Sequence, residues 1–185
     1  MAYTMRGYEI PSGDKGTVAT VAFMERLIVA ASMHPDVRDM AVKIMRPDRV
    51  SSGMAIQTLR RWLSVVVQYV RDPVTAEALT DPVAMVQRIA EQGRVAGDCD
   101  DVAMLACAMA LSVGFRARLA AVAFKGTAPL TGAVDNADPF LHIWGEVAPP
   151  TGTLVWTEMD TTRPMQRIPV NAFSRVWIVP IPREG

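Results

Sequence analysis

The stretch Gly97-Asp98-Cys99-Asp100-Asp101, followed by an almost unbroken apolar run over residues 102–113, decides the fold of this protein. Asp98 has a side chain of the kind that caps a helix N-terminus, and Asp101 completes a capping box in which Asp replaces Glu. We therefore expect a helix that begins near Cys99. Because this helix is apolar on nearly all sides, we expect it to be buried at the centre of the molecule.

Cys99 falls in the first turn of this helix, where free backbone N–H groups and the positive end of the helix dipole favour a thiolate. Its own N–H is placed to donate to an oxyanion formed during acyl transfer. The neighbouring carboxylates act in the opposite direction, because negative charge disfavours a thiolate. A nearby imidazolium is therefore needed if Cys99 is a nucleophile. The alternative is a small buried cysteine in an acid-capped helix.

The second cysteine, Cys107, lies in the middle of the same predicted helix, among apolar neighbours. Along a helix axis it is about 12 Å from Cys99, whereas a disulfide needs Cα atoms within about 7 Å. We therefore predict that the two cysteines do not pair and that Cys107 belongs to the core. The lack of a disulfide framework fits a reducing compartment or a domain large enough not to need one.

The chain has two histidines. His34 precedes Pro35 in a helix-breaking segment and is predicted to be a solvated turn residue. His142 lies in a predicted strand over residues 140–147, where alternation separates an aliphatic core face from a second face that includes His142. The core face is predicted to hold Leu141, Ile143 and Val147, and the second face to hold Phe140, His142, Trp144 and Glu146.

Asp160 ends the next predicted strand, 154–160. A hairpin register that pairs Ala148 with Leu154 puts His142 directly opposite Asp160, with Cβ atoms about 5 Å apart. A hydrogen bond between imidazole and carboxylate would then fix the tautomer, as in a catalytic triad. A one-residue slip would move Asp160 to the other face of the sheet. The alternatives are a half-buried sheet histidine and a strand-end carboxylate that caps the Thr161-Thr162 turn.

Helical patterns come first in the chain and strand patterns follow. Helices are expected over 17–32, 35–45, 52–70 and 83–92, and strands over 115–124, 140–147, 154–160 and 175–181. This order predicts an α+β fold in which a helical N-terminal half contributes a buried nucleophile helix that packs on an antiparallel sheet. We expect a helical extension over residues 1–50 and a core over 51–185, together forming one compact unit.

The composition of the chain argues against two classes of binding partner, nucleic acid and membrane. Lys plus Arg and Asp plus Glu are equal at 19 each, so the chain lacks the positive charge typical of a nucleic-acid binder. Residues 1–16 lack the apolar segment of a signal peptide, and the longest uncharged apolar run, 102–115, is shorter than the roughly 20 residues of a membrane span. We expect a soluble protein that binds neither nucleic acid nor membrane. Composition does not define the oligomeric state.

Three segments in this order resemble the transglutaminase-like superfamily. They are the Gly97–Asp101 stretch with its helix and the following Gly114-Phe115-Arg116-Ala117-Arg118, the segment 140–147, and the segment 156–161. Residues 61–72 are similar to the helix before the nucleophile, and the resemblance covers roughly residues 55–162. It implies a papain/transglutaminase-like core with Cys99 as nucleophile, His142 as general base and acid, and Asp160 as the residue that orients the histidine.

The resemblance implies thiol-dependent acyl transfer on a peptide or protein substrate, with hydrolysis of a peptide, isopeptide or amide bond as the favoured outcome. One alternative is a protein-crosslinking transglutaminase. Another is a non-catalytic structural or assembly protein of a virion, since similar helical extensions occur in phage- and prophage-encoded members. The implied location is accordingly cytoplasmic or virion-associated.

Two features of the implied site stay open. The second oxyanion donor in such folds is a Gln or Trp side chain upstream of the cysteine, and Trp62, Gln68 and Gln92 are candidates. No cofactor is expected, although acidic residues flanking the cysteine bind calcium in some bacterial relatives. Asp98 and Asp100 have these positions, but helix capping explains them equally well. A zinc site of Cys99, His142 and two carboxylates is a further alternative, with an uncommon ligand set.

Overall fold

The computed structural model describes residues 14–71, 78–125, 140–152, 154–162 and 173–182. Within them, helices are α1 (Asp14–Ser32), α2 (Pro35–Met45), α3 (Ser52–Val66), α4 (Pro82–Gln92) and α5 (Cys99–Ser112). Strands are β1 (Val67–Tyr69), β2 (Val95–Gly97), β3 (Arg116–Phe124), β4 (Phe140–Ala148), β5 (Thr157–Glu158) and β6 (Phe173–Pro180). The helical half precedes the main sheet along the chain, as the sequence predicts.

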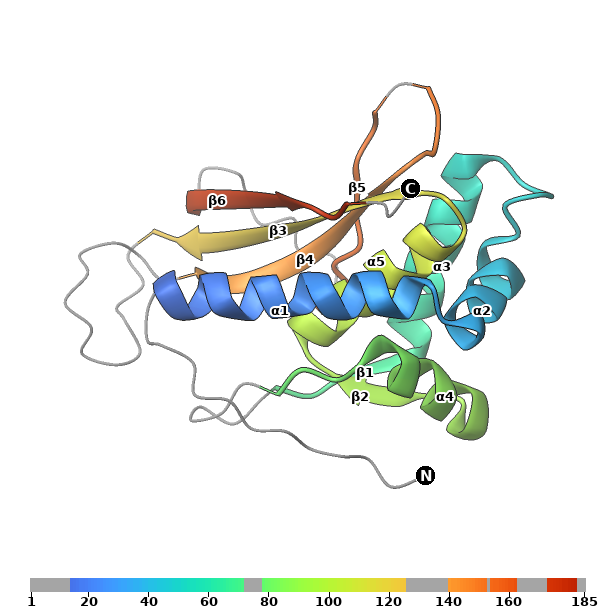
Figure 1. Cartoon of the computed structure of the whole chain (residues 1–185), viewed down its shortest axis with the longest axis horizontal. Coiled ribbons are helices and arrows are strands. Elements are labelled where there is room, and N and C mark those ends of the chain that lie inside the picture. Colours follow the sequence, from blue (N-terminus) through green and yellow to red (C-terminus); the bar gives the residue numbers. More distant parts are fainter. Residues whose placement is uncertain (1–13, 72–77, 126–139, 153, 163–172, 183–185) are drawn as a thin grey trace.

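The main sheet has four strands in the order β5-β4-β3-β6, and all of its neighbouring pairs are antiparallel. Helix α5 packs against β4 and β3, and α1 packs along α5, so that both helices lie on one side of the sheet (Figure 1). This arrangement confirms the predicted α+β architecture, with a central helix packed on an antiparallel sheet.

Helix α5 begins as its sequence predicts. The Asp98 carboxylate accepts from the backbone N–H groups of Asp100 and Asp101, and the Asp101 carboxylate accepts from the N–H of Asp98. The predicted capping box is therefore present. The helix is buried along nearly its whole length, and Cys107 is fully buried, which confirms its assignment to the core. Both cysteines are free thiols.

The predicted helix over 52–70 is too long. Helix α3 ends at Val66, and the chain continues as β1, which pairs in parallel with β2. Val65, Val66 and Val67 are β-branched and favour extended structure, and the backbone partner for β1 comes from residues 95–97, a strand that the sequence pattern did not indicate. Val70, the last residue of the predicted helix, is half exposed.

His34 lies in the bend between α1 and α2 with its side chain 38 % exposed, as predicted for a solvated turn residue. It is the N-cap of α2, and its Nδ1 accepts a hydrogen bond from the backbone N–H of Asp36 at 3.2 Å. The helix that it caps covers Pro35–Met45, as predicted. The imidazole therefore completes a helix start, a role that is more common for Ser, Thr, Asp or Asn.

The first described helix shares its core with the rest of the chain. Side chains of α1 and α2 belong to the same apolar cluster as those of α5 and the sheet, and α1 begins at Asp14 rather than Thr17. The division into an extension over 1–50 and a core over 51–185 stays a prediction. The sequence also predicts an extended arm or loop over residues 1–16 and a loop over residues 125–138. Residues 1–13 and 126–138 of these two segments lie outside the described residues.

Among the helices that the structure describes, none has by itself both the length and the apolar composition of a membrane span. Helices α1 and α2 meet these criteria only as a pair, and they are bent by 79° relative to each other.

Candidate active site

His142 and Asp160 form a buried hydrogen-bonded pair. The His142 Nε2 atom lies 2.6 Å from Oδ2 of Asp160, and both residues are less than a tenth exposed. The other carboxylate oxygen accepts from the backbone N–H of Thr162 at 2.9 Å and from its hydroxyl at 2.7 Å. The two roles considered for Asp160 are therefore both present. Its carboxylate is hydrogen-bonded to His142, and it also caps the turn at Thr161-Thr162.

The predicted register of the hairpin is wrong by two residues. Strand β4 pairs with β5 through Glu146–Glu158 and Val147–Thr157, rather than in the register that opposes Ala148 to Leu154. Because side chains alternate with a period of two, a two-residue shift leaves Asp160 on the same face as His142. Strand β5 ends at Glu158, but the backbone N–H of Met159 still donates to the Gly145 oxygen at 2.8 Å. The chain therefore stays against β4 up to the residue before Asp160, which keeps the carboxylate near the imidazole.

The alternation in β4 is as predicted from His142 to Val147, but Phe140 and Leu141 depart from it. Phe140 was expected on the second face and packs against the main core. Ile143 and Val147 belong to the main core, whereas Trp144 belongs to a separate small cluster and its ring centroid lies 5.7 Å from that of His142. Leu141 was expected in the core but is 38 % exposed. It is the extra residue of a β-bulge, because Val122 pairs with His142 and Ala123 with Phe140. Such bulges redirect neighbouring side chains, and this one immediately precedes His142.

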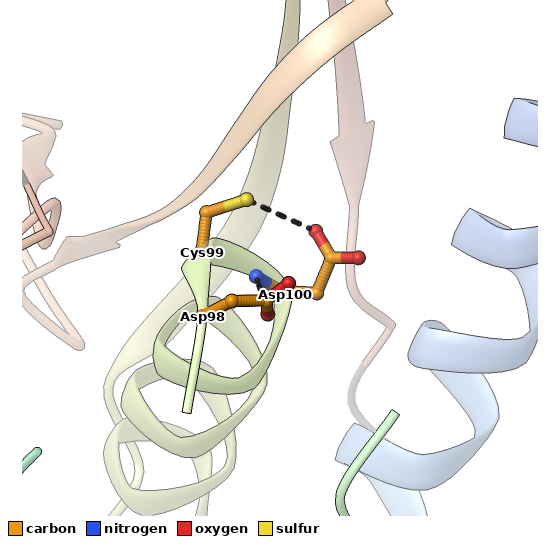
Figure 2. A group of neighbouring side chains, drawn as sticks. All are labelled: Asp98, Cys99 and Asp100. Atoms are coloured by element: carbon orange, nitrogen blue, oxygen red, sulfur yellow. Dashed lines mark hydrogen bonds between the residues drawn. The ribbon is translucent and has the colours of Figure 1, made fainter. Parts of the chain in front are cut away.

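Cys99 occupies the first position of α5, and its sulfur has two hydrogen-bond partners among the described residues. The thiol donates to Oδ1 of Asp100 at 3.5 Å (Figure 2), and the backbone N–H of Ile143 donates to the sulfur. Burial raises the pKa of the Cys99 thiol well above its usual range, and the charges of Asp100 and Asp98 raise it further. The Ile143 amide lowers this pKa but does not outweigh the other effects.

Strand β4 therefore connects the three predicted triad residues. Ile143, which contacts the sulfur, directly follows His142, which contacts Asp160. The imidazole is not itself a hydrogen-bond partner of the sulfur among the residues described. Because Nε2 is hydrogen-bonded to Asp160, Nδ1 is the ring nitrogen that could exchange a proton with the Cys99 thiol. Burial raises the pKa of Asp160, but the hydrogen bond and the charge of His142 together lower it below its usual value.

Asp98 and Asp100 were considered as calcium ligands. Ligand atoms of Asp98, Cys99 and Asp100 lie within 4.8 Å of one another, the one such cluster of at least three potential ligands in the described part of the chain. Calcium takes about six to eight oxygen ligands, whereas this group offers two carboxylates and a sulfur. One oxygen of Asp98 also caps α5 by accepting from two backbone N–H groups. These residues alone do not fit a calcium ion, and His142 is outside the cluster.

The candidates for the second oxyanion donor lie in different surroundings. Gln68 and Gln92 line a polar cavity of about 670 Å³ together with Arg88 and Arg94. Gln68 pairs with Ala96, which is three residues before Cys99. Trp62 is partly buried against the main core. The role of all three stays a prediction.

Two contacts around α5 were not predicted from the sequence. A Cβ atom on Gly145 would lie 2.8 Å from the sulfur of Cys107, so this glycine lets β4 approach the helix closely. An isolated glycine in a strand is a recognisable signal of such an approach. Thr80 binds Asp101 through both its backbone N–H and its hydroxyl. No local pattern indicates this second contact.

Sequence comparison identifies the family. The model of the transglutaminase-like superfamily matches residues 38–161, about two thirds of the chain. The chain therefore belongs to the transglutaminase-like superfamily, whose fold supports thiol-dependent acyl transfer.

No curated protein matches the sequence. Among solved structures, the crystal structure of a "putative cysteine protease" from Cytophaga hutchinsonii is similar, with 19% sequence identity and a TM-score of 0.48. The similarity covers 83% of this chain and 45% of that one, so this chain spans less than half the length of that protein.

Proposed function

We propose that this protein is a thiol-dependent acyl-transfer enzyme that hydrolyses a peptide, isopeptide or amide bond in a peptide or protein substrate. The observation that carries the proposal is the continuity of contacts from Cys99 through Ile143 and His142 to Asp160. Membership of the transglutaminase-like superfamily supports the same chemistry. Triads of this kind are recognised by geometry and role rather than by position in the sequence.

In the proposed reaction, Nδ1 of His142 accepts the proton of the Cys99 thiol as the sulfur attacks the acyl carbon. A carbon–sulfur bond forms, the bond to the leaving amine breaks, and the imidazolium returns its proton to that amine. The Asp160 carboxylate holds the imidazole with Nε2 protonated and stabilises its charged form. Water, activated by the same imidazole, then releases the acid and regenerates the thiol.

The surroundings of Cys99 define how the thiol is activated. Burial and two carboxylates raise the pKa of this thiol, so a preformed thiolate is disfavoured in the described conformation. We propose that the sulfur turns from Asp100 toward His142 when substrate binds, and that proton transfer accompanies the attack. The backbone N–H of Cys99, at the start of α5, is the proposed donor to the oxyanion.

A reactive ester tests the proposal without knowledge of the natural substrate. Incubation with p-nitrophenyl acetate is expected to release a burst of p-nitrophenol and to leave an acetyl group on Cys99, detected by mass spectrometry of the digested protein. Cys99→Ser should abolish the acetylated peptide and His142→Ala should slow its formation. Cys107→Ser is the matched control, because the Cys107 sulfur is fully buried and faces the core.

The fate of the acetyl group separates hydrolysis from transamidation. Release by water at a rate unaffected by added primary amine supports a hydrolase, whereas faster release by amine with formation of an acetylamide supports a transglutaminase. Equal acetylation of Cys99 in the wild type and in His142→Ala would contradict the enzyme proposal. That result would favour the non-catalytic structural or assembly role.

A further inference from the structure

Asp101 is a buried carboxylate that the proposed reaction does not use. One oxygen accepts from the backbone N–H of Thr80 at 2.7 Å. The other accepts from the Thr80 hydroxyl at 3.3 Å and from the Asp98 N–H at 3.4 Å. A capping box needs only the last of these bonds. The two bonds to Thr80, which is 21 residues away in the chain, serve some other purpose.

The segment that contains Thr80 is anchored on both sides. Leu79, the preceding residue, packs against the main core, and Asp81, the following residue, caps α4 by accepting from the Val83 N–H at 2.8 Å. The bonds from Thr80 to Asp101 therefore join the start of α4 to the start of α5. Asp101 is only 4% exposed, so water competes little for these bonds.

Gly97 allows the chain before α5 to lie close to the Asp101 side chain. A Cβ atom on residue 97 would lie 2.9 Å from the Cβ of Asp101, which is closer than real contacts allow. The neighbour in this contact is the root of the Asp101 side chain, which cannot swing aside. The start of α5, which includes Cys99, is therefore closely packed at Gly97 and hydrogen-bonded to Thr80 through Asp101.

We propose that Thr80 and Asp101 form a positioning clamp that holds the start of α5, and with it the Cys99 sulfur, in reach of His142. This inference rests on the proposed function. Loss of the clamp leaves the nucleophile and the base intact but lets the helix start shift relative to β4. Misplacement of reacting atoms by about 1 Å can cost on the order of 10²-fold in rate.

Thr80→Val is the sharpest test, because it removes one hydroxyl and changes neither charge nor backbone. We expect the rate of Cys99 acetylation by p-nitrophenyl acetate to fall by on the order of tenfold, and Thr80→Ser to restore it. Asp101→Asn should lower the rate further. Thr80→Val should add little to Asp101→Asn, since residues that act as one unit are not additive.

Ser51→Ala is the matched control, because it removes the N-cap of α3 and leaves both Thr80 and Asp101 unchanged. It should lower the melting temperature and leave the acetylation rate within about twofold of the wild type. A wild-type rate in both Thr80→Val and Asp101→Asn would overturn the clamp, as would an equal loss of rate in Ser51→Ala. If His142→Ala still slows acetylation in that case, the clamp fails and the proposed enzyme stands.

Discussion

The carboxylate of Asp160 lies 2.6 Å from the imidazole of His142, although the ladder between β4 and β5 ends at Glu158 and does not oppose the two residues. The bonds that Thr162 donates to the second carboxylate oxygen hold this oxygen in place beyond the end of the strand. The pair therefore depends on the turn at Thr162 as well as on the pairing with β4, where the Met159 N–H donates to the Gly145 oxygen at 2.8 Å.

This relationship predicts the effect of Asp160→Asn. The amide no longer stabilises an imidazolium and favours the wrong tautomer, so the rate of Cys99 acetylation should fall by on the order of 10³-fold or more. Thr162→Val is the control, since it removes one bond to the second oxygen and leaves the bond to His142. If the control loses as much activity as Asp160→Asn, the turn and not the charge is responsible.

Asp100 is predicted to restrain the nucleophile. It accepts a hydrogen bond from the Cys99 thiol and its charge raises the pKa of that thiol, so Asp100→Asn should favour the thiolate. A decrease of one pKa unit corresponds to about tenfold more thiolate. Alkylation of Cys99 by iodoacetamide near neutral pH should therefore accelerate by about that factor. Asp39→Asn, an identical change of charge on the exposed surface of α2, should have no such effect.

Gly145 is predicted to be intolerant of any side chain. Alanine there would place a Cβ 2.8 Å from the Cys107 sulfur and 3.1 Å from the backbone oxygen of Ala103. Overpacking of this kind costs about 1–3 kcal/mol, measurable by urea unfolding, and should also separate β4 from α5 and slow acetylation. In Gly53→Ala, where a new Cβ meets nothing within 4 Å, stability should not fall. Cys107→Ala should partly relieve the effect of Gly145→Ala, and strict additivity would contradict this packing.

Titration of Asp101 should make the free energy of unfolding depend on pH. Burial raises the pKa of this carboxyl from 3.8 to about 7. The folded protein therefore binds the proton more tightly than the unfolded chain. The stabilising contribution of the Asp101 carboxyl is fully present at a pH below its pKa in the unfolded chain. This contribution is lost as the pH rises toward its pKa in the folded protein, about 7.

The size of this contribution is on the order of 4 kcal/mol. Asp101→Asn should make the free energy of unfolding less dependent on pH between about 4 and 7. Asp160 has the opposite sign, because its pKa is lowered and its contribution is lost only when the pH falls through that value. An unchanged slope in Asp101→Asn would show that another group titrates in this range.

Much of the candidate site was predictable because its signals are local. The capping box at Asp98 and Asp101, the apolar run of α5 and the two-residue period of β4 depend on neighbours in the chain. The period also explains why the face of Asp160 was predicted correctly although the register was not. Three motifs in order were enough to indicate the superfamily.

By contrast, what depends on distant backbone was not predictable. Residues 67–69 form β1 only because residues 95–97 lie beside them, and Leu141 is exposed because it is the extra residue of the bulge between β4 and β3. The candidate site residues could be named from the sequence alone, since helix caps and strand alternation depend on short-range patterns. Only the tertiary structure decided how Thr80 meets Asp101 and how Ile143 meets Cys99, because such contacts depend on how separate elements pack together.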